Sequence, residues 1–118
     1  MFAEQRKHPR VSYVASVDIL ITAIQRVLYK GLIKNISIGG LAFETEVELK
    51  IGDECAFLFY LPSQKSIKVI GHIVWEFKDK NSFFYGVQFS KIGFISKFVL
   101  KQFIYNKLRE EEKVLVKH

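Results

Sequence analysis

Hydrophobic and polar residues alternate along most of the range 11–90, with the period of two that is typical of β-strands. The clearest stretch is Val11 to Ile21, in which the odd-numbered residues share an apolar face and Ser12, Ser16 and Asp18 lie opposite. The same pattern predicts further strands over 26–33, 41–47, 54–61, 67–77 and 83–89. Six strands at hairpin-like spacing predict a mainly β fold, an antiparallel barrel or sandwich.

One apolar row in the strand 67–77 includes Trp75. Because Trp75 continues the alternation of Ile67, Val69 and Ile73, we expect its ring in the core rather than on the surface as a stacking platform. Cys55 lies in another alternating run and is expected to be a small buried hydrophobic residue.

The apolar period changes to three and four residues over 92–109, which predicts a C-terminal helix. One apolar row is expected to pack on the barrel: Ile95, Val99 and Phe103. A second row is formed by Leu100, Ile104 and Leu108. Since one helix seldom buries two rows in a small domain, we hypothesise that the second row contacts a partner or forms a homodimer. Residues 110–118 are expected to be a frayed tail.

The length of 118 residues predicts one domain, with 49% hydrophobic and 25% charged residues as in folded proteins. The net charge of +6 favours an anionic partner, which could be a nucleotide, a nucleic acid or a membrane surface. The sequence has neither a signal-peptide-like N-terminus nor an apolar run of membrane-spanning length. We therefore expect a cytoplasmic protein without a membrane span.

Residues with catalytic or metal-binding chemistry are isolated in this sequence. Cys55 is the only cysteine, and His8, His72 and His118 have no partners at motif spacing. No serine-hydrolase, zinc-protease or phosphate-loop motif occurs. We expect a protein that is not an enzyme and that has no metal site.

The candidate binding residues lie in two short stretches. The first, 34–40, places Asn35 and Ser37 before Gly39 and Gly40, between two predicted strands. Adjacent glycines permit backbone conformations that include positive φ, and they leave room for a ligand. In an extended backbone Asn35 and Ser37 would share a face. Local turn chemistry explains both residues equally well.

The second stretch carries Arg6 and Arg10, with Pro9 between them. Pro9 disfavours a helix, so the two arginines are expected about 13 Å apart on an extended, flexible arm over residues 1–10. Such an arm could be a solvated basic tail, a nonspecific phosphate binder or half of a specific nucleotide site.

Together, the RxxxR pattern of Arg6 to Arg10 and the NxSxxG pattern of Asn35 to Gly40 resemble the PilZ domain family. The resemblance extends to Phe89 and implies a six-stranded antiparallel β-barrel with a C-terminal α-helix. The whole chain, 1–118, would then be a single PilZ domain, with the arm at 1–10, the barrel at 11–90, the helix at 92–109 and the tail at 110–118.

The family binds cyclic di-guanosine monophosphate (c-di-GMP), and the resemblance implies which residues would contact it: Arg6, Arg10, Asn35, Ser37, Gly39 and Gly40. The arginines would grip guanine edges and phosphates, since arginine donates bidentately to guanine. Asn35 replaces the more usual aspartate and offers only a neutral carbonyl. Gln5 stands where many members have another arginine, so binding of one ligand or of an intercalated pair stays open.

The resulting prediction is a c-di-GMP receptor that changes conformation and protein contacts on binding, and so regulates motility, exopolysaccharide or biofilm formation through a downstream protein. The arm would fold over the ligand. The alternative is a nucleotide-independent PilZ-like adaptor of the pilus or motility machinery. A basic barrel that binds RNA or DNA ranks last, because the lysines lie on loops and on the helix.

Overall fold

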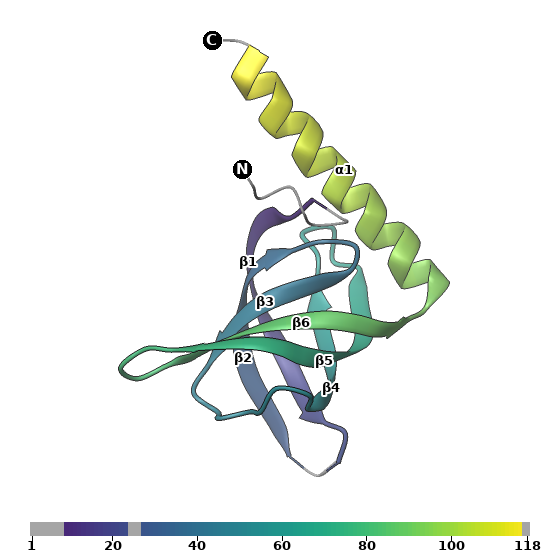
Figure 1. The fold of residues 1–118 in the computed structure, drawn as a ribbon. Coiled ribbons are helices and arrows are strands. Elements are labelled where there is room, and N and C mark those ends of the chain that lie inside the picture. The colour runs from purple at the N-terminus through teal and green to yellow at the C-terminus, as the bar shows by residue number, and fades with distance from the viewer. Residues whose placement is uncertain (1–8, 24–26, 117–118) are drawn as a thin grey trace.

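The computed structural model describes residues 9–23 and 27–116, with side chains up to residue 112. Its elements are β1 (Val11–Ile21), β2 (Leu28–Ile36), β3 (Gly40–Thr45), β4 (Glu54–Tyr60), β5 (Ser66–Lys78), β6 (Phe83–Ile92) and α1 (Phe94–Val116). The strands form a closed barrel in the order β1-β2-β3-β6-β5-β4, and every neighbouring pair is antiparallel. The mainly β fold, the six-stranded barrel and the C-terminal helix are thus confirmed (Figure 1).

Alternating residues of the strands fill the barrel interior. Val17 and Ile19 of β1 are fully buried as the alternation predicts, and Phe57 of β4 is fully buried as well. The rings of Phe43 and Phe57 meet edge to face, with centroids 5.4 Å apart, near the middle of this core. Cys55 is buried in the same cluster, so its predicted role as a core residue is confirmed.

Helix α1 crosses one end of the barrel (Figure 1), where Leu100 and Ile104 are fully buried in the core. The expectation that the row of Leu100, Ile104 and Leu108 faces a partner is therefore wrong. Val99 and Phe103 are partly buried against the same core, but Ile95 of the first row is 72% exposed. The reason is the position of the helix, because its first turn precedes the point where it meets the barrel end.

The helix also continues to Val116, where the sequence predicted a frayed tail from residue 110. Glu110, Glu111 and Glu112 carry the helix on, because glutamate and lysine are good helix formers. The part of α1 that follows Leu108, a residue still packed against the core, extends beyond the barrel (Figure 1), so helix propensity rather than packing accounts for these last turns.

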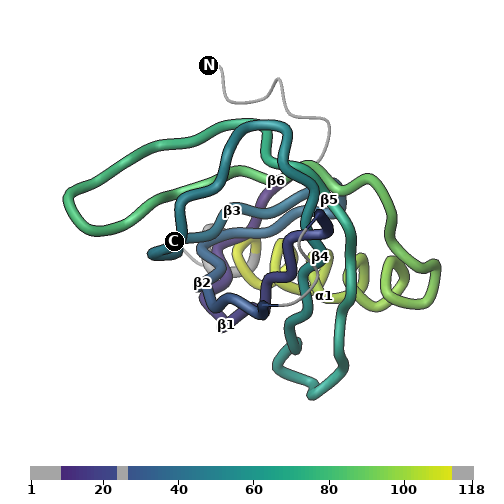
Figure 2. Tube along the Cα trace, turned by 90° about the horizontal axis from the view of Figure 1, so that it is seen from below, coloured from purple at the N-terminus to yellow at the C-terminus, as the bar shows by residue number. Residues whose placement is uncertain are grey.

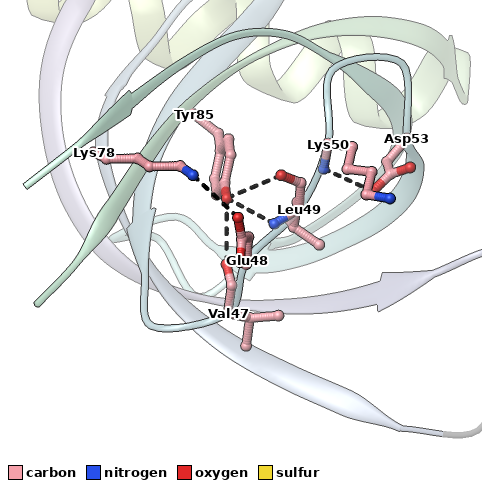
Figure 3. A network of polar contacts seen from close by, with 7 residues as sticks. All are labelled: Val47, Glu48, Leu49, Lys50, Asp53, Lys78 and Tyr85. Atoms are coloured by element: carbon pink, nitrogen blue, oxygen red, sulfur yellow. Dashed lines mark hydrogen bonds and ion pairs between the residues drawn. The ribbon is translucent and has the colours of Figure 1, made fainter.

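A buried tyrosine fastens the connection between β3 and β4 to the barrel (Figure 3). The Tyr85 hydroxyl accepts a hydrogen bond from the Leu49 amide at 2.7 Å and lies 3.2 Å from the Leu49 carbonyl oxygen and 3.5 Å from that of Val47. Beside it, Lys78 pairs with Glu48 at 3.1 Å. Burial raises the pKa of the Tyr85 hydroxyl, so it stays protonated at neutral pH.

Two elements project beyond the barrel wall in both views. The β5–β6 hairpin extends as a two-stranded ribbon, and the first turn of α1 stands out from the barrel at the end of β6 (Figures 1 and 2). Both projections expose large apolar side chains, including Phe77 on the hairpin and Phe94 on the helix.

Candidate functional site

Arg10 and Asn35 come from the two candidate motifs and meet at the surface of the barrel. Arg10 immediately precedes β1, and its Nη1 donates to Oδ1 of Asn35 on β2 at 3.2 Å. Both residues are half-buried. The pairing of β1 with β2 places Ser12 opposite Asn35, so the chain leading into β1 necessarily passes this side chain. Arg6 lies outside the described residues, as does the rest of the arm before Pro9.

A β-bulge directs Asn35 outward. Ile33 and Ile36 are both fully buried, although strict alternation would place residues three apart on opposite faces. Lys34 is the extra residue, because Ile33 pairs with Phe43 and Asn35 pairs with the next residue, Ala42. Bulges re-aim side chains in this way and are frequent beside functional sites.

Ser37 is used by the turn that follows β2. Its hydroxyl accepts hydrogen bonds from the amides of Gly39 and Gly40, both at 3.1 Å, and lies 3.3 Å from the Gly40 carbonyl oxygen. The Ser37 side chain is buried in this turn, while Asn35 is on the outer surface. The turn chemistry that the sequence left open is therefore present, and the two side chains do not share one open face.

Gly40 in this turn is required by space rather than by backbone conformation. Neither Gly39 nor Gly40 has φ in the left-handed region, so the expectation that they supply positive φ is wrong. A Cβ on Gly40 would lie 2.1 Å from the Val87 carbonyl oxygen of β6, and the Gly39 carbonyl accepts from the Phe89 amide at 2.9 Å. The turn is pressed against β6, which only glycine at position 40 permits.

Asn35 belongs to a row of paired residues that crosses five strands of the barrel on its outer face. Ser12 pairs with Asn35, Asn35 with Ala42, Ala42 with Gly86, and Gly86 with Trp75. We call these five residues the outer row. Directly paired residues on antiparallel strands point to the same side of a sheet. The row therefore begins beside Arg10 and ends at an indole ring.

Trp75 was expected in the core, but it lies on the outer surface with 39% of its area exposed. A second bulge is the cause. Ile73 pairs with Val87 and Trp75 with the adjacent Gly86, so Val74 is the extra residue and the alternation is reversed beyond it. Ile73 stays in the core, whereas Trp75 turns out.

The indole covers Gly86, the next residue of the outer row. A Cβ at Gly86 would lie 1.9 Å from Nε1 of Trp75, so the ring rests on the bare backbone. Ala42 and Gly86 are both buried, which leaves a floor of small residues between Asn35 and the indole. A glycine inside a strand often indicates such a close approach. Gly86 is thus the sequence signal that could have pointed to Trp75 as a surface residue.

The charges beside Asn35 are partly paired. Lys34 Nζ forms an ion pair with Glu44 at 3.2 Å. Hydrogen bonds, first from Ser82 and second from Lys34, lower the pKa of the Glu44 carboxyl, so it is ionised at neutral pH.

Among the described residues no cluster of metal-binding side chains occurs, and no helix is long and apolar enough to cross a membrane.

Comparisons with known proteins identify the family and the fold. The PilZ domain family matches residues 4–106. The PilZ domain of YcgR from Escherichia coli, solved with c-di-GMP, aligns with a TM-score of 0.72 at 15% identity, covering 98% of this chain and 100% of that one. No curated protein matches.

Two longer proteins share the same fold. The Bacillus subtilis inhibitor of motility, MotI/DgrA, aligns with a TM-score of 0.77 at 21% identity over 88% of this chain. YcgR from Escherichia coli in complex with c-di-GMP aligns with a TM-score of 0.77 at 13% identity over 96% of this chain. The chain spans only about half of each, 52% of MotI/DgrA and 50% of YcgR.

Proposed function

The chain belongs to the PilZ domain family, and from this premise we propose that it is a c-di-GMP receptor that acts by binding, without catalysing a reaction. PilZ is a family of binding and adaptor domains, not a known enzyme class. Two structural relatives with this fold, the YcgR domain and YcgR itself, were solved with c-di-GMP. On binding, the chain would change the surface that it offers to a downstream protein, in control of motility, exopolysaccharide or biofilm formation.

The contact between Arg10 and Asn35 is the observation that carries the proposal. These residues are 25 positions apart, yet the guanidinium and the amide are 3.2 Å apart. If residues 1–10 were only a solvated basic tail, no hydrogen bond between Arg10 and the side chain of Asn35 would be expected. The pair offers a cation for phosphate and a set of planar donors and acceptors for a base edge, which are the groups that a cyclic dinucleotide requires.

The proposed roles follow from the positions of the residues. Arg10, with Arg6 from the arm, would bind guanine edges and phosphates, and Asn35 would bind the second guanine. Ser37, Gly39 and Gly40 complete the proposed site. Because the Ser37 hydroxyl already makes three contacts within the turn, its contribution would be to hold the turn beside Asn35, and a direct contact with phosphate would require exchange of one of them.

Trp75 adds a stacking surface to the proposed site. Three strand spacings of about 4.8 Å separate β2 from β5, so the indole stands about 14 Å along the outer row from the backbone of Asn35. Ala42 and Gly86 between them present no large side chain. Stacking of a base on an aromatic ring contributes about 1–3 kcal/mol in nucleic-acid complexes. A ligand with two bases could use Asn35 and Trp75 together.

Calorimetric titration with c-di-GMP tests the proposal. We expect micromolar or tighter binding by the native chain and its loss in Arg6→Ala/Arg10→Ala. Arg109→Ala is the matched control, because Arg109 is an exposed arginine on α1 that belongs to neither motif, and it should bind like the native protein. The stoichiometry distinguishes one bound ligand from an intercalated pair.

Tryptophan fluorescence gives a second, independent measurement. Trp75 is the only tryptophan in the sequence, so a change in emission that saturates with the calorimetric curve would report a ligand on the outer row. If the well-folded native protein does not bind c-di-GMP, the receptor proposal is wrong and the nucleotide-independent adaptor takes its place.

A further inference from the structure

Three large apolar side chains stand out from the first turns of α1, at a distance along the chain from the candidate motifs. Phe94 is 84% exposed, Ile95 is 72% exposed and Phe98 is 61% exposed. We call these three residues the helix corner. They lie at positions i, i+1 and i+4, on the helix face opposite the buried Leu100 and Ile104. The turn that carries them projects beyond the barrel in both views (Figures 1 and 2).

Lysines surround the helix corner. An open groove of about 740 Å³ between the end of β6, β5 and the start of α1 is lined by Lys68, Lys91 and Lys97. Lys101 follows one helical turn after Lys97 and is exposed. None of these four lysines is in an ion pair with another described residue, and no carboxylate lines the groove. Protruding apolar side chains and unpaired positive charges thus occupy the same side of the molecule.

We propose that the helix corner docks on an anionic membrane surface. Phenylalanine and isoleucine enter the boundary between headgroups and acyl chains, while lysines beside them pair with anionic headgroups. A lysine close to such a surface strengthens binding about fivefold. Three apolar side chains alone would bind a membrane weakly, and so would a few lysines alone. Stable membrane binding therefore requires both kinds of side chain at one corner.

The shape of the corner favours a lipid surface over a protein. Protein interfaces need a partner pocket that matches each buried side chain, because packing at their centre approaches that of a protein interior. Phe94 and Ile95 are largely exposed and line none of the grooves described for this chain, and Phe98 borders an apolar groove of about 490 Å³ that Pro62 and Phe103 also line. A fluid acyl boundary accepts such protruding side chains without a pocket shaped to each of them. The complementary charge of an anionic leaflet then selects the membrane surface and orients the barrel on it.

Vesicle co-sedimentation is the direct test. We expect the native chain to bind phosphatidylcholine vesicles that contain phosphatidylglycerol and to bind pure phosphatidylcholine at least tenfold more weakly, with affinity that falls as salt rises. Phe94→Ser/Phe98→Ser should lose at least tenfold in affinity. Lys91→Gln/Lys97→Gln should lose a similar factor, about fivefold for each lysine.

Matched controls come from the opposite projection of the molecule. Phe77 on the β5–β6 hairpin is 60% exposed, like Phe98, so Phe77→Ser removes an equally exposed aromatic ring from another place. Lys50→Gln/Lys80→Gln removes the same charge from two exposed loops. Both controls should bind vesicles like the native chain. If they weaken binding as much as the corner variants, attraction is general and the proposal is wrong.

Insertion of the corner is measured with a relocated tryptophan. In Trp75→Phe/Phe98→Trp the only tryptophan is at the corner, and we expect its emission to shift to the blue on anionic vesicles and to be quenched by brominated acyl chains. An unshifted emission in co-sedimented protein would overturn the proposal. Absence of vesicle binding, together with a dimer in sedimentation velocity that Phe94→Ser/Phe98→Ser dissociates, would overturn it in favour of a second copy of the chain.

Discussion

The two halves of the barrel differ in the regularity of their strand pairing. On one side, β4 pairs with β1 and β5 without any register shift. On the other side, the pairings of β1 with β2, of β2 with β3 and of β5 with β6 each shift beside a residue of the outer row, and only the pairing of β3 with β6 is free of a shift. We call these the regular half and the bulged half. In the regular half alternating side chains fill the core, whereas in the bulged half the shifts present Asn35 and Trp75 to the outside.

The difference indicates that the regular half mainly contributes stability and the bulged half mainly contributes the ligand-binding surface. Each bulge leaves a residue without a ladder partner, which weakens the strand locally. The barrel can accept these shifts because the core is anchored by regular strands and by Leu100 and Ile104 at its end. Stability should therefore be most sensitive to substitutions in the regular half, and ligand binding to those in the bulged half. Four predictions test this difference, from the largest expected effect to the smallest.

Phe57→Ala should have the largest effect. Phe57 is fully buried on β4 in contact with Phe43, and truncation of such a ring lowers the free energy of unfolding by about 3–5 kcal/mol. Urea unfolding followed by circular dichroism measures the loss. Trp75→Phe on the outer row is the comparison and should cost less, about 1 kcal/mol, because the smaller ring still covers Gly86. Equal losses in the two variants would abolish the distinction between the halves.

Gly40→Ala tests whether the bulged half is constrained by close backbone contact. The added Cβ would lie 2.1 Å from the Val87 carbonyl oxygen, so strands must shift, at a cost of about 1–3 kcal/mol. Gly93→Ala is the control, since a Cβ there meets nothing within 4 Å. Thermal unfolding of both variants measures the difference. A Gly40→Ala protein as stable as Gly93→Ala would show that the turn has room.

The free energy of unfolding of the protein should fall in alkaline solution, because the thiol of Cys55, in the regular half, ionises more readily in the unfolded chain. Burial raises the pKa of its thiol from 9.0 to about 11, with smaller contributions from Asp53 and Glu54. Because the folded-state pKa is the higher one, the stabilisation is complete below pH 9 and is lost as the pH rises towards 11. The loss amounts to about 2 kcal/mol over this range.

Urea unfolding at a series of pH values measures this dependence, and Cys55→Ala is the matched variant. It should be less stable at neutral pH, because it leaves a small cavity, but its stability should fall less steeply between pH 9 and 11. Parallel curves for the native and Cys55→Ala proteins would exclude Cys55 as the titrating group.

Asn35→Asp should have the smallest effect on stability and a clear effect on binding. A carboxylate beside Arg10 makes charge-assisted hydrogen bonds and can accept from the guanine N–H donors, a gain of about 1 kcal/mol or about fivefold in c-di-GMP affinity. Calorimetry measures the affinity and urea unfolding the stability. A variant that binds more weakly than the native chain would show that Asn35 contributes to binding through its amide N–H.

The sequence predicted most of the barrel because alternation is a local signal. Val11–Ile21 has the predicted bounds, and β4 and β6 begin at the predicted residues. The strand pairing of the regular half has no shift that interrupts this signal, and Cys55 was placed correctly in the core. The contact between Arg10 and Asn35 agrees with the paired motifs, although the ligand roles of these residues and of Ser37, Gly39 and Gly40 remain predictions.

The placement of Trp75 and the burial of the helix could not be predicted in the same way. A bulge adds one residue to a strand without any change in composition. The alternation predicted from the sequence therefore continued through Val74 and assigned Trp75 to the wrong face of the strand. The period of α1 gave two apolar rows but not the position at which the helix meets the barrel. That position buried Leu100 and Ile104 and left Ile95 exposed.

By itself, the sequence determined the strands, the helix and the two polar motifs, because each depends on neighbouring residues and on the side chains that they carry. Only the tertiary structure decided where the strand pairing shifts. A shift depends on the fit between strands that are distant in the chain, as when Gly40 and Gly86 let β6 and the indole come close. These long-range fits turned Asn35 and Trp75 to one surface, and so decided where the proposed ligand would bind.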